Sequence, residues 1–526
     1  MHVGPDRSAP VWLWCLGLLI ILGVLLPIVG LILAYREPPG LFGAPELTFE
    51  RVWPLLLKSL ALSSLVSCFS LLIGTWFAWC ETRMAYSGRR ILAFLSILAL
   101  ATPSYLIATI VREQFAPAGF FGNMLGLDGT FTGFWPSVLV LTVACTPYVH
   151  LLAAAALRRC PIAEEDAARS LGASPARVLK TVIAPRLRST WSFALVLVGL
   201  YVVSDFGAVA ILDCEVLTWE LYKARDGREA VALAFGLLLV VLPLLAAVRL
   251  LKSHRFEDRT QVHRRVDRKP LPVTVLTLTW FLHGMVIGLG VILPFVSLFG
   301  WIQGGLENQV EFSPVLTPGL TTLFIAGLSA IAVVIASALV AYLAHIVRPR
   351  TAAWIENAVY VTSSLPGILV AVGILKLVVG LKRQASHDLW PWLDALGLFL
   401  LVGYIMRFLS QGYAAIFPGI ERLDQSQIEA ARSLGSTRAR SFRRVVLPAL
   451  KPSLLAAYAL LFLSIAKELP ITLMLIPLGH TTLSYRIFDG QQEGSLPDVG
   501  LAGMTLLLMA FILQILITRW SRDDGV

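Results

Sequence analysis

Long apolar segments recur along the whole chain and alternate with short polar ones. An α-helix needs about 20 mostly apolar residues to cross a bilayer, and twelve segments meet that requirement. We therefore predict an all-α integral membrane protein with about twelve transmembrane helices. The predicted spans are roughly 11–34, 55–79, 91–111, 135–157, 191–212 and 230–251 in the first half of the chain, and roughly 275–301, 320–344, 355–380, 395–417, 454–477 and 500–519 in the second.

The composition supports a chain that is largely exposed to lipid. Of its 526 residues, 57% are hydrophobic and only 14% are charged, too few to cover a water-soluble protein of this size. The first apolar run is longer than the core of a signal peptide, and no small-x-small cleavage site follows it. We therefore interpret it as a retained first helix.

The formal charge of +10 indicates membrane topology more than a nucleic-acid partner. Lys and Arg gather in the short segments that lie on the same side of the membrane as the N-terminus. Segment 302–319, on the opposite side, has none. Positive residues favour the cytoplasmic side. We predict a bacterial inner (plasma) membrane protein with both termini in the cytoplasm. The predicted internal segments are 1–10, 81–90, 158–190, 252–272, 345–354, 418–452 and 520–526.

The chain contains a repeat whose period is half its length. The sequence Ala-Ala-Arg-Ser-Leu-Gly occurs at 167–172 and again at 430–435, an offset of 263 residues. Both copies lie between the fourth and fifth predicted spans of their halves, so both halves enter the membrane with the same orientation. We predict a first half at 1–251, a charged cytoplasmic linker at 252–272 and a second half at 273–526.

Each repeated loop, 158–190 and 418–452, predicts a short helix that projects from the cytoplasmic side. The helices are expected at 163–171 and 427–434, each ended by a glycine that adopts a left-handed cap, Gly172 or Gly435. Ser174 and Thr437 are expected to cap a second helix in each loop. Pro185 and Pro448 are then expected to stop or turn the chain as it re-enters the membrane.

Two interpretations of these loops are open. Basic amphipathic loops would lie on anionic lipid, which explains their charge but not why glycine, proline and paired alanines recur at one offset. Paired alanines form a small, smooth face that lets another protein approach closely. We favour a docking surface that is present twice.

The loops resemble the EAA loop of type I ABC importer permeases (MetI-like), in which an acid and two alanines precede a glycine and a later proline. The first copy departs by having Asp where Glu is usual. The resemblance implies two copies of an ABC ATPase docked on the loops and an external solute-binding protein. The implied docking residues are Asp166, Ala167, Ala168, Gly172 and Pro185 in the first copy, and Glu429, Ala430, Ala431, Gly435 and Pro448 in the second.

The chain has no Gly-x-x-x-x-Gly-Lys-Ser/Thr loop with which to hold nucleotide phosphates. We therefore expect no cofactor on this chain and no enzymatic activity of its own. ATP would be bound and hydrolysed by the separate ATPase subunits.

Two carboxylates within predicted spans are related by the same offset. Asp205 and Glu468 are each followed two residues later by a residue that breaks helices, Gly207 or Pro470. Ionisable residues inside membranes are costly and commonly functional, and broken helices commonly line cavities. These four residues and Lys467 are our candidates for a translocation path, with no dedicated metal site. The acids favour a cationic solute, although Lys467 opposes them, and a purely structural role stays open.

The sequences around these carboxylates, Ser204–Ala210 and Lys467–Leu475, resemble ferric-iron importers with fused permeases. The resemblance implies iron as the solute, with a binding protein on the outer loops 112–134, 213–229 and 478–499. Thiamine, a polyamine or another small cation are alternatives within the same class. A secondary transporter driven by an ion gradient is the rival from another class, but it would leave the doubled loop unexplained.

Overall fold

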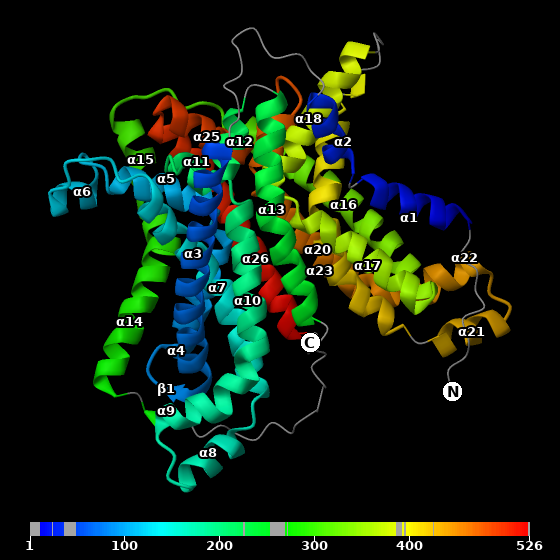
Figure 1. Ribbon diagram of the computed structural model, residues 1–526, viewed down its shortest axis with the longest axis horizontal. Helices are drawn as coiled ribbons and strands as arrows, with labels where there is room; N and C mark the ends of the chain where they lie inside the picture. Colours follow the sequence, from blue (N-terminus) through cyan, green and yellow to red (C-terminus); the bar gives the residue numbers. More distant parts are fainter. Residues whose placement is uncertain are drawn as a thin grey trace.

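The computed structural model describes residues 11–23, 25–35, 49–224, 227–252, 269–270, 272–384, 392–393, 396–423 and 425–523. Within them the chain is a helical bundle, and its β-structure is one two-residue parallel pairing of β1 (Met84–Ala85) with β2 (Lys269–Pro270) (Figure 1). The all-α prediction is confirmed. Most of the predicted linker 252–272 lies outside the described residues.

The elements of the first half run from the N-terminal helices to the last helix before the linker. They are α1 (Val11–Gly23), α2 (Leu26–Tyr35), α3 (Phe49–Arg83), α4 (Arg89–Leu98), η1 (Ala99–Ala101), α5 (Ser104–Gln114), α6 (Phe120–Leu125), α7 (Phe134–Arg159), α8 (Ile162–Ser170), α9 (Pro175–Val178), η2 (Leu179–Ile183), α10 (Ala184–Ser204), α11 (Gly207–Ile211), α12 (Leu217–Lys223) and α13 (Gly227–Lys252).

The second half repeats this order. Its elements are α14 (Val273–Ile287), η3 (Gly288–Ile292), α15 (Leu293–Glu307), α16 (Leu316–Ile346), α17 (Pro349–Ser364), α18 (Gly367–Gln384), α20 (Leu398–Glu421), α21 (Gln425–Ser433), α22 (Arg438–Ser441), η4 (Phe442–Val446), α23 (Leu447–Ala466), α24 (Pro470–Leu475), α25 (Leu483–Glu493) and α26 (Leu496–Asp523). We call two positions matched when they are 263 residues apart.

The number of uninterrupted spans is smaller than the sequence predicts. In the described part of the chain, nine helices are long and apolar enough to cross a membrane, and α4–η1 with α5 make a tenth as a pair bent by 98°. The predicted span 11–34 is divided into α1 and α2, and the predicted span 355–380 into α17 and α18. At about 1.5 Å per residue, neither α1 nor α2 alone reaches across about 30 Å of hydrocarbon.

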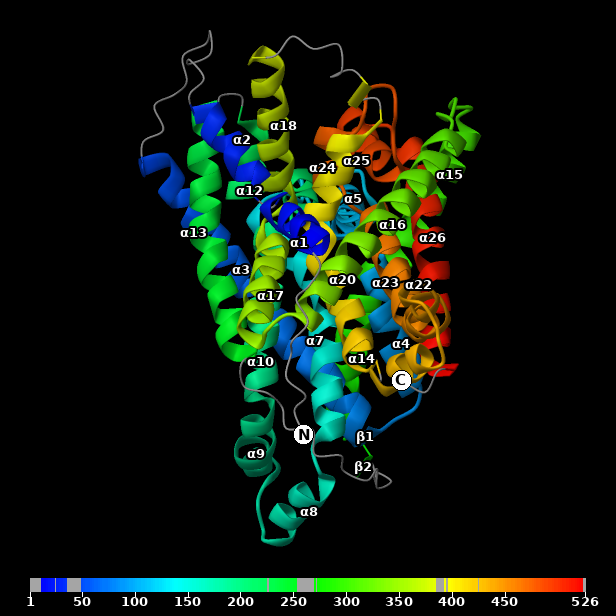
Figure 2. The ribbon, with the colours of Figure 1, turned by 90° about the vertical axis from the view of Figure 1, so that its right-hand side faces the viewer.

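Each half sends its first helices against the other half. Helix α1 packs on α16 and α17, and α2 on α18, while α14 packs on α3 and α4 and α15 on α5 (Figure 2). Hydrogen bonds secure the second of these exchanges: Trp76 Nε1 donates to Thr279 Oγ1 (3.2 Å) and Thr102 Oγ1 to the carbonyl of Gly290 (2.7 Å). The two halves therefore form one interlocked bundle.

Proline residues break one helix in each half at matched positions. Pro103 lies between η1 and α5, and Pro366 lies between α17 and α18. Proline lacks the N–H that would continue a helix and restricts the residue before it. A second break in each half separates α10 from α11 and α23 from α24. These four breaks supply the walls of the cavity described below.

The prediction that Pro185 and Pro448 stop or turn the chain is wrong. Each lies in the first turn of a long helix, α10 or α23. A five-residue π-helical segment, η2 or η4, directly precedes that helix without a break. A proline in a regular helix collides with the carbonyl four residues earlier. The wider π-turn relieves that collision, so the helix passes through.

Candidate translocation cavity and loop helices

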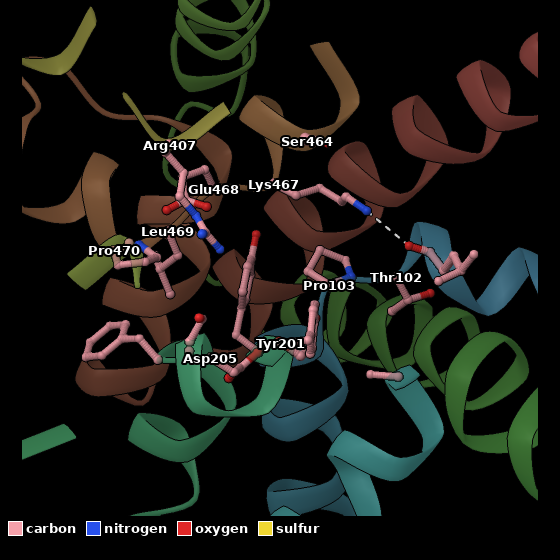
Figure 3. Close-up of a pocket in the computed structure, with 18 of the residues that line it drawn as sticks. Thr102, Pro103, Tyr201, Asp205, Arg407, Ser464, Lys467, Glu468, Leu469 and Pro470 are labelled. Atoms are coloured by element: carbon pink, nitrogen blue, oxygen red, sulfur yellow. Dashed lines mark hydrogen bonds between the residues drawn. The ribbon is translucent and has the colours of Figure 1, made fainter. Parts of the chain in front are cut away.

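A cavity of about 250 Å³ lies between the two halves, where the broken helices meet. Its walls come from η1 and the start of α5, from α7 and α20, and from the breaks that precede α11 and α24 (Figure 3). All five residues of the predicted path, Asp205, Gly207, Lys467, Glu468 and Pro470, line it. We call it the central cavity.

Asp205 is held by hydrogen bonds to both of its carboxylate oxygens. Ser104 Oγ donates to Oδ2 (2.5 Å), and the main-chain N–H of Ala208 donates to Oδ1 (2.9 Å). The second bond satisfies a donor in the first turn of α11 that has no partner within the helix. Gly207 is the first residue of α11. The prediction of a broken span is confirmed, because α10 ends at Ser204 and α11 begins at Gly207.

Glu468 occupies the matched position before α24 but lacks the matched partner. Its Oε1 is shielded from solvent and accepts no hydrogen bond from any residue that the structure describes. The position matched to Ser104 is Gly367, where even a Cβ atom would lie 2.7 Å from Glu468 Oε1. Pro470 is the first residue of α24, a position that suits proline, and it begins a helix instead of ending one.

Both basic side chains of the central cavity come from the second half. Lys467 Nζ donates to the carbonyl of Leu100 in the first half (3.0 Å), and Arg407 Nη1 donates to the carbonyl of Leu365 (3.1 Å). The matched residues in the first half are Ser204 and Ala144, which carry no charge. Figure 3 shows Arg407 beside Glu468 and Lys467 directed away toward the first half. Lys467 was a candidate from the sequence, whereas Arg407 lies within the predicted span 395–417, where spacing along the chain identifies no partner for it.

The cavity offers oxygen atoms but no metal cage. Among the described residues, no group of three or more His, Cys, Asp or Glu side chains converges on one point. The Tyr105 hydroxyl and Ser204 Oγ, like Glu468 Oε1, are buried and without a hydrogen-bond partner in the described part of the chain.

The two repeated loops form short helices at the same end of the bundle, as predicted (Figure 1). Helices α8 and α21, which we call the loop helices, are each followed by a glycine with positive φ: Gly172 at 81° and Gly435 at 80°. These are the left-handed caps expected from the sequence. Ser174 Oγ accepts from the N–H of Arg177 (3.4 Å), and Thr437 Oγ1 accepts from that of Arg440 (3.3 Å).

The exposed surface of the loop helices is the same in both copies. The acids Asp166 and Glu429 and the alanines Ala167 and Ala430 are exposed, whereas Ala168 and Ala431 are half-buried. Two matched leucines project furthest: Leu171 is 89% exposed and Leu434 is 88% exposed. Both leucines belong to the repeated hexapeptide, but the acid, alanine and glycine pattern gives no reason to select them. Large apolar side chains held in water on a capped turn indicate a contact surface for a partner.

A buried ion pair fixes the first loop helix to the bundle. Arg83 Nε lies 2.8 Å from Glu165 Oε1, and these side chains are 7% and 1% exposed. Arg83 also donates to the carbonyls of Leu157 (2.9 Å) and Cys160 (3.3 Å), while Arg169 lies 3.3 Å from the other oxygen of Glu165. The end of α3, the end of α7 and helix α8 are thereby joined.

The second half has no counterpart of this pair at the matched positions, which are Ile346 and Ile428. Ile346 packs against an apolar cluster that includes Tyr413 and Phe417, whose rings stack with centroids 5.0 Å apart. Sequence reasoning missed Arg83 and Glu165. A position-by-position comparison of the two repeats would have found them, because isoleucine replaces both charged residues in the second half.

A bundle of two interlocked repeats, with broken helices around a central cavity and paired loop helices at one end, defines a membrane permease. Residues 70–255 and 334–523 each match the family described as binding-protein-dependent transport system inner membrane component. The chain belongs to this family, is a multi-pass inner-membrane protein and carries the family domain twice. The resemblance to fused ABC importer permeases is confirmed.

Particular relatives extend over different parts of the chain. The Fe(3+)-transport system permease protein FbpB 2 of Haemophilus influenzae is 25% identical over 524 residues, covering 98% of this chain and 99% of that protein. The ferric transport system permease protein FbpB of Actinobacillus pleuropneumoniae is 22% identical over 504 residues, or 89% and 71% of the two chains. The putative 2-aminoethylphosphonate transport system permease protein PhnV of Salmonella typhimurium is 30% identical over 176 residues, or 34% and 63%.

Proposed function

We propose that this chain forms the transmembrane path of an ATP-driven importer for ferric iron. The central cavity carries the proposal, because it lies between the two repeats and brings Asp205 and Glu468 together from opposite halves. Oxygen donors suit a hard cation such as ferric iron. Two relatives that cover most of this chain are named as ferric-iron permeases.

The relatives also rank the alternatives. The phosphonate permease matches only a third of this chain, whereas a ferric-iron permease matches nearly all of it. No relative cited above is named for thiamine or a polyamine, so iron is the better-supported solute. A secondary transporter would have no use for two loop helices with matched exposed leucines.

We propose two ABC ATPase subunits as the partners of the loop helices, one on each. Leu171 and Leu434 would enter grooves on the ATPases, with Asp166 and Glu429 beside them. ATP would be held by those subunits and not by this chain. The loop helices and both termini would then face the cytoplasm, in agreement with the distribution of Lys and Arg, and an external binding protein would deliver the solute to the outer loops.

Co-purification tests the class of protein and its ATPase partner. The detergent-solubilised chain is expected to recover an ABC ATPase at two copies per permease. Changing Leu171→Asp together with Leu434→Asp should reduce that recovery at least tenfold, because charges would replace the apolar contacts. Leu478→Asp is the matched control, since Leu478 is 94% exposed but lies in a predicted outer loop.

Uptake of ⁵⁵Fe by proteoliposomes that contain the permease, the ATPase and a ferric-binding protein tests the solute. Iron should accumulate only when ATP is present on the side of the vesicle membrane where the ATPase is bound. A chain that purifies without an ATPase and moves solute along an ion gradient would contradict the importer proposal. An importer that moves another solute but not iron would contradict only the choice of iron.

A further inference from the structure

The charged side chains that line the central cavity balance one another. Counted by formal charge, Asp205 and Glu468 contribute two negative charges, and Arg407 and Lys467 contribute two positive charges. Moving an ion out of water into a protein interior is unfavourable unless opposite charges compensate for the lost hydration. A bare trivalent cation would find no net negative charge here, and two of the four groups would repel it.

The carboxylate oxygens of the cavity, two on Asp205 and two on Glu468, are too few to surround a bare ion. Asp205 already accepts bonds from Ser104 and Ala208 on separate oxygens. The buried oxygens left without a hydrogen bond in the described residues around the cavity are Glu468 Oε1, Tyr105 Oη and Ser204 Oγ. Hard cations take about six oxygen ligands. An iron ion in this cavity would therefore need further ligands, and a small anion that travels with it would supply them.

The two basic groups have the chemistry to hold such ligands. A guanidinium group presents a planar fork of donors that matches phosphate or carboxylate oxygens, and an ammonium group is a compact charge with three donors. The matched residues of the first half are Ala144 and Ser204, so this capacity is confined to one half. A cavity of about 250 Å³ is much larger than a single ion and has room for a small complex.

We infer that the permease passes ferric iron as a complex with an oxyanion, such as phosphate or a carboxylate, and not as a bare ion. Glu468, Tyr105 and Ser204 would face the metal, while Lys467 and Arg407 would face the oxyanion. A ferric complex of a divalent or trivalent anion carries little net charge, so it suits a cavity whose own charges cancel. This inference rests on the proposed iron function and adds the chemical form of the solute.

Two isotopes measured together test the inference. Proteoliposomes holding the complete importer would be supplied with binding protein that carries ⁵⁵Fe and [³²P]phosphate, or ⁵⁵Fe and [¹⁴C]citrate, after removal of free label. We expect one of the anions to accumulate with iron at close to one anion per iron, dependent on ATP. Accumulation of iron without either labelled anion would overturn the inference while leaving the iron function intact. Absence of iron uptake during ATP hydrolysis would instead count against the proposed function.

A variant tests the residue that the anion would contact. Lys467→Gln removes the positive charge and should lower uptake of iron with its anion at least fivefold, with ATPase recovery unchanged. Lys451→Gln is the matched control, because Lys451 lies on α23 but is exposed and is not among the residues that line the cavity. Unchanged co-uptake in Lys467→Gln would overturn the role given to this lysine. The isotope ratio of the unaltered protein does not depend on whether the variant folds.

Discussion

The first and second halves share one fold but hold their matched acidic positions differently. In the first half, Ser104 bonds to Asp205 and Arg83 pairs with Glu165. In the second half, glycine replaces the serine, and isoleucines replace both members of the ion pair. The helix breaks, capping glycines and exposed leucines are common to both. The shared features therefore build the fold, and the polar partners give each half its own role.

This difference predicts a fixed role for the first half and an active one for the second. Asp205 has both oxygens engaged and serves the start of α11, whereas Glu468 keeps one buried oxygen without a partner in the described residues. The second half also supplies both basic groups of the cavity. Solute contact is thus expected to fall mainly on the second half, and firm attachment of a loop helix on the first.

The largest difference in stability should come from variants of the buried ion pair between Arg83 and Glu165. Arg83→Met leaves Glu165 buried without its main partner, and losing one member of such a pair lowers the free energy of unfolding by about 3–5 kcal/mol. The double variant Arg83→Ile with Glu165→Ile copies the second half and should lie within about 1 kcal/mol of the unaltered protein, because an apolar pair replaces a buried ionic one with little loss. Denaturant unfolding in detergent measures both.

The matched control for that contrast is Ile346→Met, a change of similar volume expected to alter stability by less than about 1.5 kcal/mol. Equal losses in Arg83→Met and the double variant would show that the pair does more than satisfy buried charge. The comparison between the halves would then need a different physical basis.

The serine–glycine difference gives the next largest effect. Ser104→Ala removes the hydrogen bond to Asp205, and a hydrogen bond to a charged group contributes about 2 kcal/mol. The same unfolding measurement should show that loss. In the reverse change, Gly367→Ala, the new Cβ would lie 2.7 Å from Glu468 Oε1, so the carboxylate must move. Uptake, more than stability, should fall in Gly367→Ala, and a stability loss alone would contradict the active role of Glu468.

Neutralising each carboxylate separates the two roles further. Glu468→Gln should lower iron uptake at least tenfold, about 1.4 kcal/mol in transport free energy, with normal abundance of folded permease. Asp205→Asn keeps an oxygen for Ala208 and should reduce uptake by less than threefold. Vesicle uptake normalised to the amount of inserted permease provides the comparison. Equal transport defects would remove the distinction between the two halves.

Where the halves are alike, the effects should be alike and small. Ser174→Ala and Thr437→Ala each remove a helix N-cap, which contributes about 1 kcal/mol. We expect the free energy of unfolding to fall by that amount in both variants. Both caps are exposed, and each accepts a hydrogen bond from the N–H three residues later. Unequal losses would mean that the loop helices differ in more than their attachment to the bundle.

Much of the site was predictable because it depends on residue type and spacing. The offset of 263 residues located both loop helices, both caps and both cavity carboxylates, and the structure confirms those placements. The errors concern continuity of helices. Pro185 and Pro448 were expected to stop or turn the chain but lie within helices, whereas the breaks expected next to Gly207 and Pro470 are present. Apolar composition does not distinguish a bent helix from a straight one.

The membrane class, the twofold repeat and the loop helices could be read from the sequence, because hydrophobic length and local capping act over short stretches of chain. The three-dimensional structure was needed to show that the first helices cross to the opposite half and that α1 and α2 are separate. It also decided that Arg407 and Lys467 share a cavity with Asp205 and Glu468. Those facts depend on which distant side chains meet, and packing between helices sets such contacts independently of the pattern along any one of them.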